Sequence, residues 1–425
     1  MAASARWCAP VLALTIGAAA VSLTPASAAS PRLKYVVIIS RHGVRAPTWD
    51  TERLNQYSSE PWPDWGVGPG ELTPHGAVLM KAMGSYYRAW LSSEGLHTTC
   101  GDRQHVYVWA DSGQRTLESG RALGEGWSPA CPPPVHSLPA GTPDPLFDPI
   151  AAGVVTPDLT AAANAVRTRI GSDADLIATH RSAFDTLNNV LATRTRVPAK
   201  TISPPASISV AVGATSVELS EPFAVASTLT ENFLLEYANG MRGHELGWGR
   251  LNEQSLFQVL QLHGLYADLM RRTPYLARVR GSNLLAHVLR SMRQAVDGTP
   301  LADALGTPHD AVLVLSGHDT NLSNLAGMLG LSWTLPGYQA DDTPPGGALV
   351  FSIWQENGGS GYAVAVRYVA QTLTQMREAT PLSLASPPAQ QDLAIPGCGA
   401  ANARTGCPWP TFARVVQDAI DGHGR

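Results

Sequence analysis

The run LKYVVIIS (Leu33 to Ser40) is almost continuously apolar and rich in β-branched side chains. Because it does not alternate between apolar and polar residues, it predicts a strand that is buried on both faces. The runs VYVWA (Val106 to Ala110) and AVLVLS (Ala311 to Ser316) share this pattern. A helical pattern opens between the first two runs, at Thr73–Pro74. Together these features predict the α/β class, with a mostly parallel central sheet flanked by helices.

The middle of the chain has a different pattern. From about residue 156 to residue 293 helical periodicity dominates, as in SLFQVLQLHGLYADLMRR, and strand-like runs are few. We therefore predict an α-helical domain over 156–293, inserted into an α/β core formed by 30–155 and 294–425.

The N-terminus has the pattern of an export signal. A basic residue, Arg6, precedes an apolar stretch that is short for a membrane span, and PASAAS then offers a cleavage site near Ala28 or Ala29. We expect residues 1–29 to be a signal peptide, and the mature protein to be a periplasmic or secreted monomer without a membrane anchor. The net charge of -4 gives no basic field that would attract nucleic acid.

Four of the five cysteines follow this signal. An even number in an exported chain favours disulfides, and four cysteines allow three pairings. Proximity in sequence favours Cys100–Cys131 and Cys398–Cys407.

Each of the three buried runs is followed directly by residues that can carry chemistry. The segment RHGVR (41–45) follows the first run, DSGQRT (111–116) the second and GHD (317–319) the third. The carboxyl ends of parallel strands lie at one edge of a sheet, where α/β proteins bind their ligands. We therefore expect three arginines, two histidines and an aspartate to share one pocket.

This set suits a tetrahedral oxyanion such as phosphate. The imidazole of His42 could attack phosphorus and form a phosphohistidine, while guanidinium groups stabilise the charge on the phosphoryl oxygens. The same cations should lower the pKa of His42 and keep it neutral. Asp319 could protonate the departing alkoxide, so it would begin protonated, which predicts an acidic optimum. This chemistry needs no metal or other cofactor.

Four alternatives remain to be weighed. Cys398 and Arg404 have the Cys-x5-Arg spacing of a cysteine phosphatase loop, although a disulfide would remove the thiolate. The twelve histidines allow a metal hydrolase, but no His-x-x-x-His motif with a glutamate is present. A mutase-like transferase would share the RHG segment. A binding protein for phosphorylated ligands would need the arginines but neither His42 nor Asp319.

RHGVRAP together with the distant SGHDTNL resembles the histidine acid phosphatase family, which is branch 2 of the histidine phosphatase superfamily. DSGQRTLESG, LTENFLLEYANGM and QTLTQMREATPLSL extend the resemblance over nearly the whole mature chain. The resemblance implies an α/β domain with an inserted helical domain, and a small-molecule phosphomonoester as substrate between them. It also matches the two local cysteine pairs.

The resemblance implies a role for nine positions. His42 matches the nucleophile, Asp319 the proton donor, and Arg41, Arg45, Arg115, His318 and Thr48 the groups around the phosphate; Glu231 and Arg272 match positions that face the substrate.

The implied activity is that of a phytase, with glucose-1-phosphatase or a broad-specificity acid phosphatase as the alternative. Two positions depart from the family pattern. Trp49 stands where bacterial phytases of this type usually carry a basic residue, and Thr228 where some relatives carry methionine. Both changes bear on the preferred substrate and leave the hydrolysis of phosphomonoesters untouched.

Overall fold

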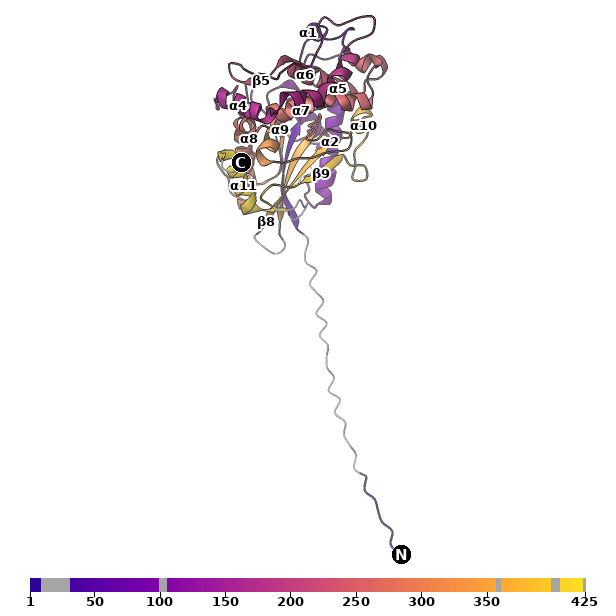
Figure 1. The fold of residues 1–425 in the computed structure, drawn as a ribbon. Coiled ribbons are helices and arrows are strands. Elements are labelled where there is room, and N and C mark those ends of the chain that lie inside the picture. Colours follow the sequence, from indigo (N-terminus) through magenta and orange to yellow (C-terminus); the bar gives the residue numbers. More distant parts are fainter. Residues whose placement is uncertain (9–30, 99–104, 357–360, 399–405, 423–425) are drawn as a thin grey trace.

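The computed structural model describes residues 1–8, 31–98, 105–356, 361–398 and 406–422 (Figure 1). Its centre is a mixed sheet with the strand order β10-β8-β7-β1-β6-β2-β3, and β9 pairs with β8. The strands are β1 (Arg32–Arg41), β2 (His105–Ala110), β3 (Val135–His136), β6 (Asp310–Gly317), β7 (Ala348–Gln355), β8 (Tyr362–Ala370), β9 (Ala389–Leu393) and β10 (Cys407–Pro408).

The three runs predicted as buried strands are β1, β2 and β6, and they lie side by side in parallel. Ser316 of β6 pairs with Ser40 of β1 and with Ala110 of β2, so the three strands end at the same level. The α/β class is therefore confirmed. Strands β7, β8, β9 and β10 add antiparallel pairs at one side. Too few residues separate β7 from β8 for the crossover that a parallel pair needs.

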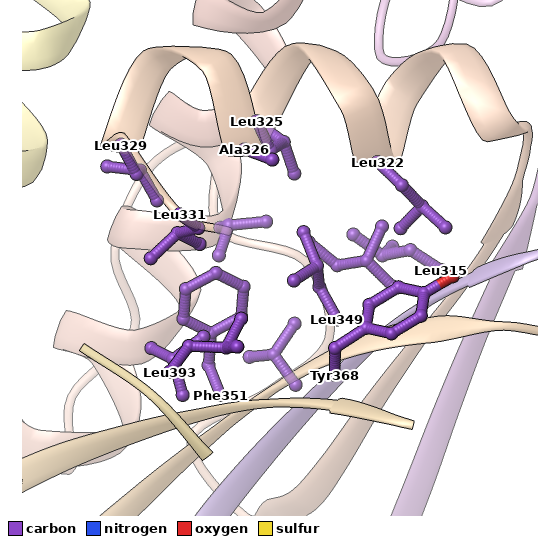
Figure 2. Close-up of a cluster of buried hydrophobic side chains, with 14 of the residues drawn as sticks. Leu315, Leu322, Leu325, Ala326, Leu329, Leu331, Leu349, Phe351, Tyr368 and Leu393 are labelled. Carbon is purple, nitrogen blue, oxygen red and sulfur yellow. The ribbon is translucent and has the colours of Figure 1, made fainter. Parts of the chain in front are cut away.

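Helices cover both faces of this sheet. Their bounds are α2 (Pro74–Ser93), α3 (Gln114–Trp127), α8 (Pro274–Asp297), α9 (Asp319–Leu329) and α11 (Trp409–Asp421). The side chains of Val37 and Ile39 pack with α8, α9 and α11, and those of Val36 and Ile38 pack with α2 and α3. Figure 2 shows leucines of α9 lying over Leu349 and Phe351 of β7. Burial on both faces explains why the strand run in the sequence does not alternate.

Helix α2 begins where the sequence predicts. Thr73 is its N-cap, and the hydroxyl of Thr73 accepts a hydrogen bond from the backbone N–H of Gly76 at 2.9 Å. Pro74 occupies the first helical position, where a missing N–H costs no hydrogen bond.

A second hydrophobic cluster lies at one end of the sheet, where Figure 1 shows α5, α6 and α7 gathered. Its elements are α4 (Leu159–Ile170), α5 (Asp173–Leu191), β4 (Val210–Val212), β5 (Val217–Leu219), α6 (Glu221–Ala238), the 3₁₀ turn η2 (Gly247–Gly249) and α7 (Glu253–Arg271). A second 3₁₀ turn, η1 (Gly243–Glu245), precedes η2 and buries no residue. Leu54 of the short helix α1 (Thr51–Leu54) joins this cluster, whereas α8 packs with the sheet from Ala277 to Ala295. The remaining described helix is α10 (Leu373–Arg377). The domain boundaries at 156 and 293 stay a prediction.

Cys398 and Cys407 form a disulfide with an S–S distance of 2.11 Å. Since its sulfur is oxidised, Cys398 has no thiolate, and the cysteine phosphatase alternative is excluded. Cys100 and most of the predicted signal peptide, residues 9–29, lie outside the described residues, as does Arg404. The pairing of Cys100 with Cys131 therefore stays a prediction. No helix within the described ranges is long and apolar enough to span a bilayer.

Candidate active site

The residues that follow β1, β2 and β6 converge at one edge of the sheet. The backbone N–H of His42 donates to the carbonyl of Gly317 at 2.9 Å, and that of Asp111 donates to the carbonyl of Ser316 at 3.0 Å. These bonds extend the parallel ladder past the ends of the strands. They fix the three loops relative to one another, as the sequence predicts.

The imidazole of His42 is buried and held in one tautomer. Its Nδ1 lies 2.8 Å from the carbonyl oxygen of Gly43. A carbonyl can only accept a hydrogen bond, so Nδ1 carries the proton and the lone pair lies on Nε2. Burial, followed by the charges of Arg41 and Arg45, lowers the pKa of His42 well below its usual value. The ring is therefore neutral, as predicted, and Nε2 can act as a nucleophile.

Arg41 and Arg45 are fixed by a shared carboxylate. Both guanidinium groups donate to Glu231 of α6, Arg45 at 3.0 Å, and Arg41 also donates to the carbonyl of Thr343 at 2.6 Å. The Nε groups of Arg41, Arg45 and Arg115 are buried and meet no acceptor in the described part of the chain. Buried donors without partners are rare in proteins, so this cluster is suited to an anion.

His318 links the third loop to the second. Its Nε2 lies 2.6 Å from the carboxylate of Asp111, and its Nδ1 lies 3.5 Å from Nη2 of Arg115. The ring of His318 meets that of His42 edge-on, with centroids 5.5 Å apart. Asp111 therefore orients His318. The sequence places Asp111 directly after a buried strand, but we did not predict this role.

Thr48 lies at the exposed rim of this cluster. Its methyl group and Nη1 of Arg115 lie 3.5 Å and 3.7 Å from the point where a Cβ on Gly70 would stand. The neighbouring Trp49 turns to the second cluster, where its ring lies 5.9 Å from that of Tyr57. The guanidinium carbon of Arg53 lies 3.7 Å above the ring of Trp49.

Glu231 contacts arginines rather than open space. Although burial acts to raise its pKa, the charges of Arg45 and Arg41 hold the pKa of Glu231 at about 2. The side chain is therefore an ionised anchor for two guanidinium groups. Its carboxylate lies in the middle of a helix, so no strand-end pattern in the sequence reveals this role.

Asp319 is the first residue of α9, and Arg271 holds it. Nη1 of Arg271, at the end of α7, donates to Oδ2 of Asp319 at 2.5 Å, and Nη1 of Arg41 lies 4.0 Å from the same oxygen. Burial acts to raise the pKa of Asp319, but Arg271 and then Arg41 hold it well below its usual value. In this arrangement the carboxyl is ionised. The prediction that Asp319 begins protonated does not hold in this arrangement, because the guanidinium of Arg271 stabilises the carboxylate.

Arg272 does not join the cluster. Its Nη2 donates to the carbonyl of Leu331 at 2.7 Å and lies 3.1 Å from the carboxylate of Asp341. Its guanidinium also lies 5.8 Å from the centroid of the Trp333 ring. Arg272 thus packs against Leu331, Asp341 and Trp333, and it is Arg271, one residue earlier, that lies at the site.

Glu231, His263 and Asp319 are the one group of possible metal ligands found among the described residues, with ligand atoms within 4.8 Å of one another. The donor set does not suit a cation here. Arg41, Arg45 and Arg271 already neutralise the two carboxylates and would repel a metal ion.

Two large cavities lie away from this cluster. One, of about 860 Å³, is lined by Arg32, Val106 and Asp310 at the opposite ends of the same strands. The other, of about 720 Å³, lies between α8 and α11. Neither cavity is lined by a residue of the segments 41–45, 111–116 or 317–319, so the candidate site is the arginine cluster.

The chain belongs to the histidine phosphatase superfamily (branch 2), whose pattern matches residues 32–371. This confirms the resemblance inferred from RHGVRAP and SGHDTNL.

Among curated proteins the chain is similar to the phytase AppA of Escherichia coli, with 39% identity over 94% of this chain and 96% of the relative. It is also similar to the glucose-1-phosphatase of Salmonella typhimurium, with 30% identity over 91% of this chain and 92% of the relative. Among solved structures, Hafnia alvei phytase in complex with tartrate matches with a TM-score of 0.84 and 37% identity, over 92% of this chain and 98% of the other.

Proposed function

We propose that this protein is a metal-independent acid phosphatase that works through a phosphohistidine at His42. The observation that carries this proposal is the free Nε2 of a neutral, buried imidazole among the guanidinium groups of Arg41, Arg45 and Arg115. A nucleophile and an anion-binding set in one place suit phosphoryl transfer.

In the first step Nε2 of His42 attacks phosphorus while the bond from phosphorus to the ester oxygen breaks. Asp319, once it has taken up a proton from solvent, gives that proton to the departing oxygen, because an alcohol leaves poorly as an anion. The phosphorylated ring is cationic, and the hydrogen bond from Nδ1 to Gly43 stabilises it. The guanidinium groups hold the three phosphoryl oxygens throughout.

In the second step water attacks the phosphohistidine, and the carboxylate of Asp319 accepts a proton from that water. The bond from phosphorus to nitrogen breaks, its electron pair returns to Nε2, and phosphate leaves. His318, which Asp111 orients, lies beside Arg115 and the ring of His42 and is placed to contact the phosphoryl group.

Our preferred substrate is phytate. The phytases of Escherichia coli and Hafnia alvei match nearly the whole chain at 39% and 37% identity, and Hafnia alvei phytase has a solved complex with myo-inositol hexakis sulphate. The similarity to glucose-1-phosphatases supports the alternative, a sugar phosphate. The guanidinium of Arg53 stacks on Trp49, which stands where bacterial phytases usually carry a basic residue.

A protein that only binds phosphorylated ligands is the second candidate. The arginines fit both functions. A binder, however, has no use for an imidazole whose lone pair is free on Nε2, or for a carboxyl group at Asp319 that could donate and accept a proton.

We also propose export to the periplasm or the medium, supported by the pattern of residues 1–29. Action as a monomer stays a prediction.

The test is a comparison of kcat/KM for phytate, glucose-1-phosphate and p-nitrophenyl phosphate at about pH 5, where a carboxyl group can be protonated. We expect phytate to be preferred, and His42→Ala to lower kcat/KM by about 10⁴-fold or more. The matched control is His309→Ala, since His309 is exposed and precedes the amino end of β6. Binding of phytate without release of phosphate by the wild type would favour the binding protein.

A further inference from the structure

The ion pair between Arg271 and Asp319 raises a problem for the proposed chemistry. A proton donor must carry a proton, but the carboxylate of Asp319 lies 2.5 Å from a guanidinium group and is mostly buried. Its other oxygen, Oδ1, accepts a hydrogen bond from the backbone N–H of Thr320 at 2.9 Å. Both contacts stabilise the ionised form.

Charged or titratable groups from four other elements face the same carboxylate. Arg41 approaches from β1 and Arg115 from α3, Glu231 from α6, and His263 and Arg271 from α7. The cations outnumber the one other carboxylate. The environment of Asp319 is therefore set mainly by guanidinium groups, and Arg271 has the largest lowering effect on its pKa.

These guanidinium groups differ in how firmly they are held. Arg41 is anchored by Glu231 and by the carbonyl of Thr343. The side chain of Arg271, by contrast, donates to Asp319 alone within the described part of the chain. It stands at the last turn of α7 on a long, flexible stem. Of the two guanidinium groups that contact Asp319, Arg271 is thus the one held by fewer anchors.

We propose that Arg271 is a positioning residue that couples the protonation of Asp319 to the binding of the substrate's phosphate group. The guanidinium turns from Asp319 to the incoming dianion, and the carboxylate takes up a proton from solvent. This inference rests on the proposed function, because it assigns the proton donor of that reaction.

The direction of this coupling follows from charge. A phosphate dianion held by Arg41, Arg45 and Arg115 brings negative charge beside Asp319 and competes for Arg271. An adjacent like charge and the loss of an opposite charge both favour the neutral carboxylic acid. When two ionisable groups interact this strongly, their apparent pKa values belong to the pair rather than to either group alone.

The first test measures proton uptake when inorganic sulfate binds, by titration calorimetry in two buffers of different ionisation enthalpy. Sulfate remains a dianion at about pH 5 and is not hydrolysed, so protons taken up belong to the protein. We expect uptake approaching one proton per sulfate in the wild type, and its loss in Asp319→Asn. Equal uptake in both proteins, or none in the wild type, would overturn the inference.

The second test compares the pH dependence of kcat/KM, which reports the free enzyme, with that of kcat, which reports the substrate complex. In Arg271→Gln the alkaline limb of kcat/KM should move up by about one to three pH units, the range that one close opposite charge produces. The alkaline limb of the kcat profile should move less, because in the substrate complex the guanidinium of Arg271 has already turned away from Asp319.

Arg271→Lys keeps the positive charge, so the alkaline limb of its kcat/KM profile should stay at the wild-type pH. Arg169→Gln is the matched control, since Arg169 pairs with Asp268 at the surface. A profile of Arg271→Gln that superimposes on the wild type contradicts the inference. If the wild type has no phosphatase activity at all, the proposed function fails, and the sulfate titration still decides the coupling.

Discussion

Two regions build the candidate site, and they contribute different kinds of groups. The carboxyl edge of the sheet supplies His42, Arg115 and Asp319, which are placed to meet the phosphate and the leaving oxygen. Helices α6 and α7 supply Glu231 and Arg271, which contact the edge residues and control their charge.

This difference shows that the position of the edge residues and their ionisation are set by different parts of the molecule. Backbone bonds between neighbouring strand ends fix the position of the edge residues, such as the bond from His42 to Gly317. Long side chains from the helices set the ionisation of these residues. We therefore expect changes at the edge to act on the rate, and changes at the helices to act on stability and pH dependence.

The largest effect is expected at the edge, in Asp319→Asn. The amide cannot protonate the leaving oxygen, so kcat/KM for phytate should fall by about 10²- to 10⁴-fold. p-Nitrophenyl phosphate has a weakly basic leaving group and should be affected far less. Initial rates on both substrates measure this ratio, and an equal loss on both would remove Asp319 from the role of proton donor.

The second largest effect is expected at the helices, where Glu231→Gln should lower the stability of the protein. Arg41 and Arg45 would lose the carboxylate that both contact in the protein interior, which should lower the free energy of unfolding by about 3–5 kcal/mol. Denaturant titration at neutral pH measures this change. The matched control is Glu118→Gln, because Glu118 forms an exposed pair with Arg121 and should change stability by less than about 1 kcal/mol.

The same variant tests a pH dependence. The pKa of Glu231 is about 2 in the folded protein, below its ordinary value of 4.5. The stabilisation is therefore fully present above the ordinary pKa and is lost as the pH falls toward 2. Glu231→Gln should show a smaller loss of stability in acid than the wild type. Some loss should remain, because the pKa of Asp319 is lowered as well. Identical acid profiles would contradict the ion pairing.

The smallest effect is expected for Arg272→Gln. This residue contacts Leu331 and Asp341 rather than the site, so its loss should cost about 1–3 kcal/mol of stability. The ratio of kcat/KM for phytate to that for p-nitrophenyl phosphate should stay at the wild-type value. A selective loss on phytate would restore Arg272 as a substrate contact and weaken the contrast between the two regions.

The edge region could be predicted from the sequence because its signals are local. An unbroken apolar run marks a buried parallel strand, and polar residues directly after it mark the strand's carboxyl end. Three such runs were enough to bring His42, Arg115 and Asp319 together. The antiparallel strands β7 and β8 are also rich in apolar residues, so their composition does not distinguish them from parallel strands. Their direction follows from the short connection between them.

The helical region could not be predicted in the same way, because helix packing decides which side chain points at the site. Arg271 and Arg272 are adjacent in the sequence, but they point to different partners, Asp319 and Asp341. Helical periodicity locates both at the end of α7 without choosing between them. Glu231 lies within a helix that is buried on most sides, so its role depends on where β1 ends in space.

The most direct test of the account is to identify the phosphorylated residue during turnover. Wild-type protein mixed with p-nitrophenyl phosphate can be quenched in alkali, in which phosphohistidine survives, and its peptides analysed by mass spectrometry. We predict one phosphoryl group on the imidazole of His42, and none in His42→Ala. Phosphate release by His42→Ala at the wild-type rate, or a phosphoryl group on another residue, would contradict the account.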